Sequence, residues 1–210
     1  MKNLLLIDDH EVVRDGVKRI LGGQPGAFKF GEARYAAAAL QLVQEHDWDL
    51  AVLDLSLEGR GGLDLLSEMK RLRPRLPVLI LSIHSEEQYA KRAFKAGASG
   101  YVTKDSPRDE LATAIHRVLS GGRYVSRSLA ETLVGEIAQG TDRPPHECLS
   151  DREFEVMRLI ASGKTVGEIA GLLSLSDKTI STYRARVLEK MALKNNAELT
   201  HYAIQKRLTE

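Results

Sequence analysis

The sequence predicts an α/β domain built on a doubly wound, five-stranded parallel sheet, followed by a small all-α domain. Three features of the 210 residues support this prediction. Short apolar runs end abruptly at polar residues near positions 8, 32, 54, 82 and 104, and a helical pattern follows each. These steps of 22 to 28 residues suit repeated strand–helix units. After residue 149 the pattern changes to four short helices.

The first domain is expected to alternate strands and helices. Apolar runs predict strands at 4–7, 28–33, 50–53, 77–82 and 100–103. Apolar residues at helical spacing predict helices at 12–21, 35–45, 63–72, 86–96 and 107–120. Ser85 with Gln88 matches a capping box, and Ser106 followed by Pro107 matches an N-cap and first helical position.

Residues 121–148 interrupt this alternation and predict a partly helical linker. Residues 128–139 can form one helix. Residues 140–145 contain glycine, aspartate and two prolines, which is typical of a solvated connection. We therefore expect a first domain at 1–120 and a second at 149–210.

The second domain is expected to contain helices at 151–161, 166–173, 177–191 and 196–205. Their N-cap signals are, in order, Ser150 with Glu153, Thr165 with Glu168, Ser176, and Asn195 or Asn196. The three-residue turn at 174–176 indicates a helix-turn-helix. Because most short helical hairpins do not bind DNA, this motif alone leaves the function open.

The composition excludes several classes of protein. A net charge of +1 predicts no partner by itself, and a single cysteine, Cys148, rules out an internal disulfide. No apolar run approaches the ~18 residues that a membrane span needs, and no signal peptide precedes Asp8. We expect a soluble, cytoplasmic protein without a membrane partner.

The ends of the predicted strands carry the side chains that could bind a ligand or take part in a reaction. Asp8 and Asp9 end the first strand and Asp54 the third, while Ser82 and Lys104 end the fourth and fifth. In a flavodoxin-like strand order of 2-1-3-4-5, the first, third, fourth and fifth strands are neighbours. The three carboxylates, the hydroxyl and the ammonium are then expected to meet at one edge of the sheet.

Such a cluster suits phosphoryl transfer to a carboxylate. Clustered carboxylates repel one another unless a hard divalent cation such as Mg²⁺ lies between them. A lysine offers a point charge to a phosphoryl oxygen. Asp54 can therefore accept a phosphoryl group, because the metal and Lys104 offset the charge of the transition state.

Two alternatives remain at this point. Asp54 taken alone is better explained as an acidic strand terminus without chemistry, and only the five residues at the strand ends taken together favour a site. A Mg²⁺-dependent aspartyl-phosphate phosphatase on a similar fold would need its nucleophile on the first strand and a second acid two residues later. Asp8-Asp9-His10 lacks that spacing, and the chain has no insertion large enough to bind a substrate.

The motifs at these strand ends resemble those of a known family. They are L-L-L-I-D-D-H, L-A-V-L-D-L-S-L, L-I-L-S-I-H-S-E-E-Q-Y-A and A-G-A-S-G-Y-V-T-K-D-S, with L-S-D-R-E-F-E-V-M-R-L-I-A-S-G and L-S-D-K-T-I-S-T-Y-R-A-R-V-L-E-K-M in the second domain. The chain resembles, over nearly its whole length, the two-component response regulators that join a CheY-like receiver to a LuxR-type (NarL/FixJ-like) helix-turn-helix.

The resemblance implies a role for each residue at the sheet edge. Asp54 would be the phosphoacceptor. Asp8, Asp9, Asp54 and the backbone carbonyl of Ser56 would hold Mg²⁺, Asp9 directly and Asp8 through water. Ser82 and Tyr101 would form a switch pair, in which the hydroxyl moves toward the phosphoryl group and the ring follows inward. Lys104 would pair with a phosphoryl oxygen. Ser56 and His84 lie where this family tunes the lifetime of the phosphoryl group.

The resemblance also implies partners. A sensor histidine kinase would donate the phosphoryl group, and double-stranded DNA would be bound by a homodimer in the active state. The protein would be a regulator and not an enzyme, beyond its own phosphoryl acceptance and loss. One departure from the family keeps a phosphorylation-independent DNA-binding regulator open as an alternative: Glu58-Gly59 stands where Pro-Gly is usual. Glu58 adds negative charge beside the site, and the loop lacks the φ restriction of proline.

The 177–191 helix presents two contrasting faces. Ile180, Tyr183, Val187 and Met191 form an apolar stripe that should face the core. The opposite face is small, polar and basic, which suits a major-groove helix as well as an ordinary solvated surface. By the family match, Ser181, Thr182 and Ala185 would face bases. The backbone contacts would be Lys178, Thr179, Arg184, Arg186 and Lys194.

Overall fold

The structure is a computed structural model that describes residues 1–22, 27–57, 61–139 and 144–209. The chain divides into two compact units, Met1–Ala138 and Gln139–Glu210. Each unit has its own hydrophobic core and is described separately below. In the described ranges, no helix combines the length and apolar character needed to span a bilayer.

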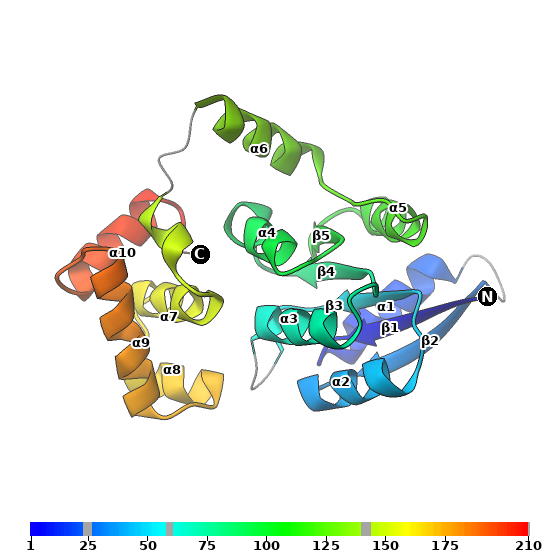
Figure 1. Ribbon diagram of the computed structural model, residues 1–210, viewed down its shortest axis with the longest axis horizontal. Helices are drawn as coiled ribbons and strands as arrows, with labels where there is room; N and C mark the ends of the chain where they lie inside the picture. The colour runs from blue at the N-terminus through cyan, green and yellow to red at the C-terminus, as the bar shows by residue number, and fades with distance from the viewer. Residues whose placement is uncertain (23–26, 58–60, 140–143, 210) are drawn as a thin grey trace. The chain divides into compact units, whose positions relative to one another are not determined.

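The first unit is built on a five-stranded parallel sheet (Figure 1). Its strands are β1 (Lys2–Ile7), β2 (Phe28–Ala33), β3 (Leu50–Leu53), β4 (Val78–Ser82) and β5 (Gly100–Thr103). Their order is β2-β1-β3-β4-β5, which confirms the predicted flavodoxin-like arrangement. Ile7 pairs with Leu53 in register, so the chain leaves β1 and β3 side by side at Asp8 and Asp54.

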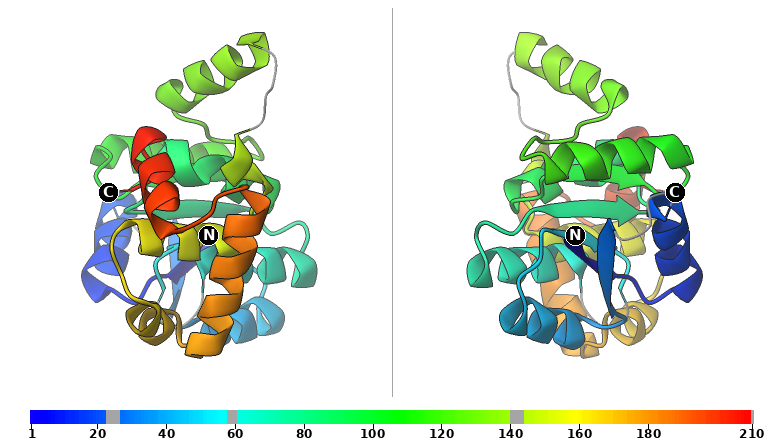
Figure 2. Two further views of the ribbon diagram at one scale, coloured as in Figure 1. Left: turned by 90° about the vertical axis from the view of Figure 1, so that its left-hand side faces the viewer. Right: turned by 90° about the vertical axis from the view of Figure 1, so that its right-hand side faces the viewer.

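Helices cover both faces of the sheet, as Figure 1 and Figure 2 show. They are α1 (Glu11–Leu21), α2 (Ala36–Glu45), α3 (Gly62–Leu72), α4 (Glu86–Lys95) and α5 (Arg108–Leu119). One core joins α1 and α5 to alternate residues of the strands, with Val17, Leu111 and Ile115 packed on Leu4 and Val52. The inner strands are buried on both faces of the sheet, which is why their sequences are continuous apolar runs.

Two of the predicted helix starts differ in detail. Ser85 is the N-cap residue of α4, but in the described part of the chain its hydroxyl accepts no capping hydrogen bond. The N-cap of α5 is Pro107 and not Ser106, since the helix begins one residue later at Arg108. The Ser106 hydroxyl instead lies 2.9 Å from the Thr103 hydroxyl. A different local contact, between residues three positions apart at the end of β5, therefore takes the place of the predicted cap.

The segment after α5 is attached to the first unit. Tyr124 forms an isolated parallel bridge with Gly100 at the edge of the sheet, and its hydroxyl donates to Glu110 at 2.8 Å. The Ser126 hydroxyl bonds to the Glu86 carboxylate of α4, and Leu129 is 2% exposed. These contacts hold the start of α6 (Arg127–Gln139). The first compact unit thus extends beyond residue 120.

The second unit is helical, as predicted. It contains a short 3₁₀ turn η1 (Pro145–Cys148), which the sequence did not indicate, and helices α7 (Asp151–Ala161), α8 (Val166–Leu173), α9 (Asp177–Lys190) and α10 (Asn196–Gln205). Both predicted capping boxes are present, at the starts of α7 and α8. Ser174 between α8 and α9 has a left-handed backbone with φ of 52°, which makes the sharp turn of the helix-turn-helix.

Candidate functional site

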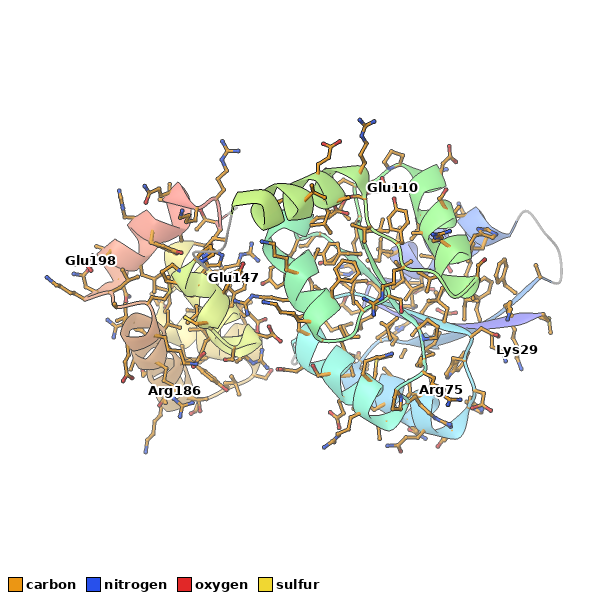
Figure 3. The ribbon with its side chains drawn as sticks, turned by 45° about the horizontal axis from the view of Figure 1, so that its top comes forward. Lys29, Arg75, Glu110, Glu147, Arg186 and Glu198 are labelled. Atoms are coloured by element: carbon orange, nitrogen blue, oxygen red, sulfur yellow. The ribbon has the colours of Figure 1, made fainter. Side chains whose placement is uncertain are left out.

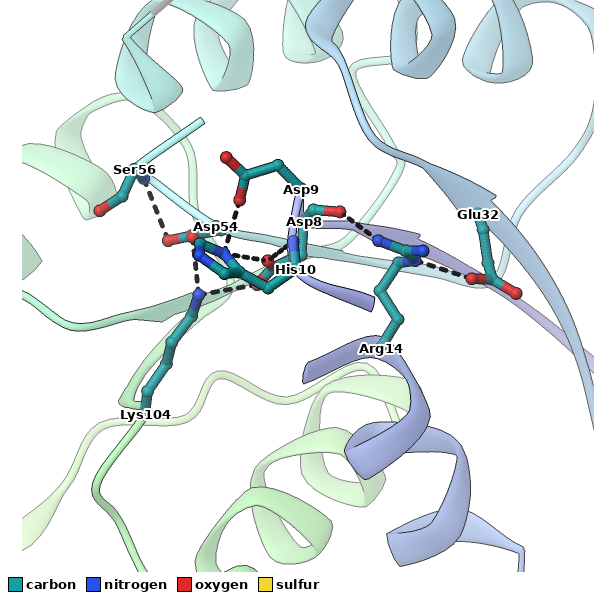
Figure 4. Close-up of polar contacts among 8 residues, drawn as sticks. All are labelled: Asp8, Asp9, His10, Arg14, Glu32, Asp54, Ser56 and Lys104. Atoms are coloured by element: carbon teal, nitrogen blue, oxygen red, sulfur yellow. Dashed lines mark hydrogen bonds and ion pairs between the residues drawn. The ribbon is translucent and has the colours of Figure 1, made fainter. Parts of the chain in front are cut away.

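The carboxyl ends of the central strands gather three carboxylates and one ammonium (Figure 4). Ligand atoms of Asp8, Asp9, His10 and Asp54 all lie within 4.8 Å of one another. Asp8 is 4% exposed and Asp54 1% exposed, so both charges are removed from bulk water. Asp8 and Asp9 follow β1 directly, and Asp54 follows β3, so the parallel register creates this cluster.

Lys104 lies between two of these carboxylates. Its Nζ donates to Asp54 Oδ2 at 2.7 Å and lies 2.7 Å from Asp8 Oδ2. Burial lowers the pKa of Lys104, but the interactions with the Asp54 and Asp8 carboxylates outweigh burial and raise that pKa overall. Burial raises the pKa of Asp54, although the hydrogen bonds from Lys104 and the Ser56 amide act in the opposite direction. Lys104 stays protonated because two carboxylates compete for it.

Asp8 and Asp9 retain capacity for a cation. Asp8 Oδ2 and Asp9 Oδ1 are buried and, among the described residues, accept no aligned hydrogen bond. Two side-chain nitrogens are nevertheless close, since Lys104 Nζ is 2.7 Å from the first oxygen and His10 Nδ1 is 2.7 Å from the second. The Lys104 contact is Coulombic and does not depend on angle. Buried oxygens without directional partners in an acidic cluster fit a hard divalent ion such as Mg²⁺.

The loop after β3 also contributes to the cluster. The Ser56 amide donates to Asp54 Oδ1 at 3.0 Å and fixes the rotation of that carboxylate. The Ser56 hydroxyl lies 3.4 Å from His84 Nε2 of the neighbouring loop. The Glu58-Gly59 departure noted in the sequence lies outside the described residues.

Ser82 and Tyr101 are linked through the backbone of His84. Ser82 and Tyr101 are both fully buried. The Ser82 hydroxyl accepts from the His84 amide at 3.2 Å, and the Tyr101 hydroxyl donates to the His84 carbonyl at 2.9 Å. The His84 ring stacks on Tyr89 of α4, with centroids 4.5 Å apart. The Tyr101 ring therefore occupies an inward position, and burial raises the pKa of its hydroxyl.

Two residues beside this cluster were not identified from the sequence. His10 lies against the Asp8 and Asp9 carboxylates. Arg14 of α1 is 3% exposed, and its Nη1 donates to the Asp8 carbonyl at 2.8 Å. A signal for Arg14 existed, because it shares helical spacing with the buried Val17 and an arginine on a buried face requires partners.

The second unit presents the predicted helix face. Ile180, Val187 and Met191 are buried, which confirms three members of the apolar stripe, while Tyr183 is only half-buried. On the other side of α9, five of the predicted DNA contacts are exposed, namely Lys178, Ser181, Thr182, Ala185 and Arg186, as is Lys194 beyond the helix. Figure 3 shows Arg186 on the outside of α9.

Several side chains on this face already have partners. The Thr182 hydroxyl donates to the Lys178 carbonyl at 2.9 Å within α9. The Thr179 hydroxyl lies 2.8 Å from the Ser176 hydroxyl, at the N-cap. Arg184 is half-buried and donates through Nε to Asn196 Oδ1 at 2.6 Å, so α10 restrains its side chain. Lys178 and Arg186 are thus more accessible than Arg184.

Comparison with known proteins gives matches over both units. Residues 4–116 match the response regulator receiver domain, and residues 147–203 match the bacterial regulatory proteins of the luxR family. The chain is 35% identical over 206 residues to the response regulator UvrY of Escherichia coli (strain K12), covering 98% of this chain and 94% of that protein. It is 33% identical to the response regulator GacA of Pseudomonas aeruginosa, covering 98% and 96%.

Solved structures agree with these matches. The RcsB response regulator of Salmonella typhimurium has a TM-score of 0.71 and 26% identity, with 98% of each chain covered. An RcsB–DNA complex has a TM-score of 0.60 and 27% identity, with 96% of each chain covered.

Proposed function

Because this chain belongs to the two-component response regulators that join a receiver to a LuxR-type DNA-binding domain, we propose that phosphorylation of Asp54 controls its binding to promoters. The donor in this proposal is a sensor histidine kinase. The observation that carries it is the position of Lys104, 2.7 Å from both Asp54 and Asp8 at the end of the central strands.

Asp54 is the proposed nucleophile. A carboxylate oxygen of Asp54 bonds to phosphorus as the bond between phosphorus and the donor's imidazole nitrogen breaks, and the departing imidazole takes up a proton. The Lys104 ammonium then pairs with a phosphoryl oxygen, which offsets negative charge gathered in the transition state. The Ser56 amide already holds Asp54 Oδ1, leaving the other oxygen beside Lys104.

Mg²⁺ fits the same cluster. Asp8, Asp9, Asp54 and the Ser56 carbonyl are its proposed ligands, with support from the buried oxygens of Asp8 and Asp9 that lack directional partners. When bound, the ion neutralises charge shared between carboxylates and phosphoryl oxygens. Lys104 alone offsets only part of the charge of three carboxylates, which is why we include a divalent cation.

Ser82 and Tyr101 are the proposed switch. In this proposal the Ser82 hydroxyl turns from the His84 amide to a phosphoryl oxygen. Because Tyr101 bonds to the carbonyl of His84, a shift of that loop changes the surface around α4. Such a change would alter either the release of the second unit or dimerisation.

The DNA contacts are proposed for α9 and the turn after it. Ser181, Thr182 and Ala185 would face base edges, and Lys178, Thr179, Arg184, Arg186 and Lys194 would contact phosphates. The exposure of most of these residues supports the proposal. Few cations lie on one copy, so we propose a homodimer on paired half-sites. A promoter-binding regulator acts in the cytoplasm, where the DNA is.

The decisive experiment compares the wild type with Asp54→Asn in the presence of a small phosphodonor and Mg²⁺. Intact mass should increase by one phosphoryl group in the wild type only, and retention on promoter DNA should rise only there. Equal DNA retention with and without the donor in both proteins would favour the phosphorylation-independent regulator.

The DNA-binding face has its own test. Arg186→Ala should weaken binding to all sequences and reduce its salt dependence, whereas Thr182→Ala should change the preference among sequences. Arg127→Ala is a matched control, because this exposed arginine of α6 pairs only with Glu131 of the same helix among the described residues. If the two α9 variants bind DNA as the wild type does, the groove assignment is wrong.

A further inference from the structure

A buried arginine lies beneath the acidic cluster. Arg14 is on α1, on the same face as Val17 and Leu21, and is 3% exposed. Its guanidinium makes two contacts in different directions, shown in Figure 4. Nη1 donates to the Asp8 carbonyl at 2.8 Å, and Nε donates to Glu32 Oε2 of β2 at 2.7 Å.

The carbonyl that Arg14 binds is at a special place in the backbone. Ile7 is the last residue of β1 that is paired with both β2 and β3. The Asp8 amide still bonds to the Ala33 carbonyl at 3.1 Å, but the Asp8 carbonyl lies beyond the ladder. A buried carbonyl without a donor is costly. In the described part of the chain, Arg14 provides that donor where the strand turns toward α1.

This turn determines where the acid pair points. After Asp8, the His10 amide donates to Asp8 Oδ1 at 2.8 Å, and the His10 carbonyl accepts from the amides of Val13 and Arg14. The Asp8 and Asp9 side chains leave the backbone between these two anchors. Arg14 therefore contributes both a backbone amide and a side-chain donor to the same short turn.

Glu32 and Lys18 complete the network. Lys18, one helical turn after Arg14, lies 2.6 Å from Glu32 Oε1. The hydrogen bond from Lys18, followed by that from Arg14, lowers the pKa of Glu32, so this carboxylate stays ionised well below neutral pH. A fixed anion beside the guanidinium reduces the positive field that Arg14 would otherwise exert on a cation at Asp8 and Asp9.

We infer that Arg14, held by Glu32, is a positioning residue that sets the Asp8–His10 turn for cation binding and phosphoryl transfer. It touches the backbone of Asp8 and not the reacting atoms. A lysine could not replace it, because one ammonium on a flexible stem cannot reach the carbonyl and the carboxylate with the fixed fork of a guanidinium. The role in phosphoryl transfer rests on the proposed function, whereas the role in ordering the turn does not.

The first measurement needs no metal. Amide hydrogen exchange of full-length Arg14→Lys is compared with the wild type in a chelating buffer. We expect exchange at the His10 amide to become at least about tenfold faster, while the amides of β3 and β4 keep their wild-type rates. Arg34→Lys is the matched control, because Arg34 is an exposed arginine near the same helix, 3.5 Å from Glu11.

The second measurement is the affinity of the same proteins for Mg²⁺, by calorimetric titration. Residues that orient metal ligands typically change affinity by 10- to 100-fold when substituted. We expect Arg14→Lys to weaken Mg²⁺ binding by about tenfold or more, and Glu32→Gln to weaken it in the same direction by a smaller factor. Arg34→Lys should match the wild type in both measurements.

The outcomes separate the two proposals. Unchanged exchange at His10 in Arg14→Lys, or exchange that rises equally in β3 and β4, would overturn the positioning role and leave Arg14 as a general stabiliser. If Arg14→Lys does not fold, Glu32→Gln is judged by the same local criterion. A wild type without Mg²⁺ affinity would overturn the proposed metal dependence, while faster exchange confined to the turn would still support the positioning role.

Discussion

Glu153 offers a sharp test of how the second unit is stabilised. Its side chain is 4% exposed and accepts two hydrogen bonds, from the Ser150 amide at 2.8 Å and from Lys190 Nζ at 2.6 Å. One contact completes the capping box of α7 and the other ties α7 to α9. Burial opposes ionisation of Glu153, but the bonds from Lys190 and Ser150 outweigh it and lower the pKa of the carboxylate.

The perturbation is Glu153→Gln, which keeps the volume and removes the charge. Hydrogen bonds to charged groups contribute about 1.5–3 kcal/mol each, and a neutral amide retains part of both, so we expect a loss of about 1–3 kcal/mol. That loss corresponds to roughly 5- to 150-fold more opening of α7 and α9. Native-state amide exchange of the intact chain measures it, with β3 of the first unit as an internal reference.

The pH dependence has a defined sign. The folded pKa of Glu153 lies below its ordinary value of 4.5, so its contribution is present above that value and is lost as pH falls through the folded pKa. The difference between wild type and Glu153→Gln should therefore be largest near neutral pH and vanish in acid. Glu131→Gln, an exposed i,i+4 partner on α6, is the control. A difference that is independent of pH would refute the reasoning.

Three further predictions concern the first unit. Gly62→Ala should destabilise it by about 1–3 kcal/mol, because a Cβ there would lie 2.3 Å from Leu55 Cα, and thermal unfolding measures the loss. Gly31→Ala should cost a similar ~1–3 kcal/mol and change the fluorescence of Trp48, since the new Cβ would meet its ring. Leu129→Ala should cost about 2 kcal/mol or more at this 2%-exposed site and speed exchange at the start of α6, with the sheet unaffected. The first prediction is wrong if Gly62→Ala is as stable as the wild type. The second is wrong if Gly31→Ala leaves the Trp48 emission unchanged, and the third if Leu129→Ala leaves exchange at the start of α6 unchanged.

Much of the fold was predictable because its signals are local. Capping boxes involve residues three positions apart, and those at Ser150 and Thr165 form as predicted. Apolar runs that end at polar residues identified the strands, and the repeated strand–helix steps indicated the doubly wound fold, whose flavodoxin-like strand order the sheet has. The approach of Asp8, Asp54 and Lys104 also followed from sequence, since parallel strands with short connections end at a common edge.

Other contacts join residues distant in the chain and have no local signature. Glu32 lies 18 positions from Arg14, and Glu86 lies 40 positions from Ser126. No periodicity links such pairs, so the network beneath Asp8 and the attachment of α6 were not predictable. Ser106 was predicted wrongly as an N-cap for a different reason: α5 begins one residue later than predicted, and the Ser106 hydroxyl lies beside that of Thr103, three positions earlier.

The sequence by itself determined most of the secondary structure and the chemical character of the site, because each depends on residue type and short-range spacing. The order of the strands followed from the fold class that this pattern indicated. Only the tertiary structure decided how the site is held. The partners of the Asp8 carbonyl and the inward position of Tyr101 depend on which side chains packing brings together. A buried polar group forms hydrogen bonds with the groups that lie close to it, and only the folded chain determines which groups those are.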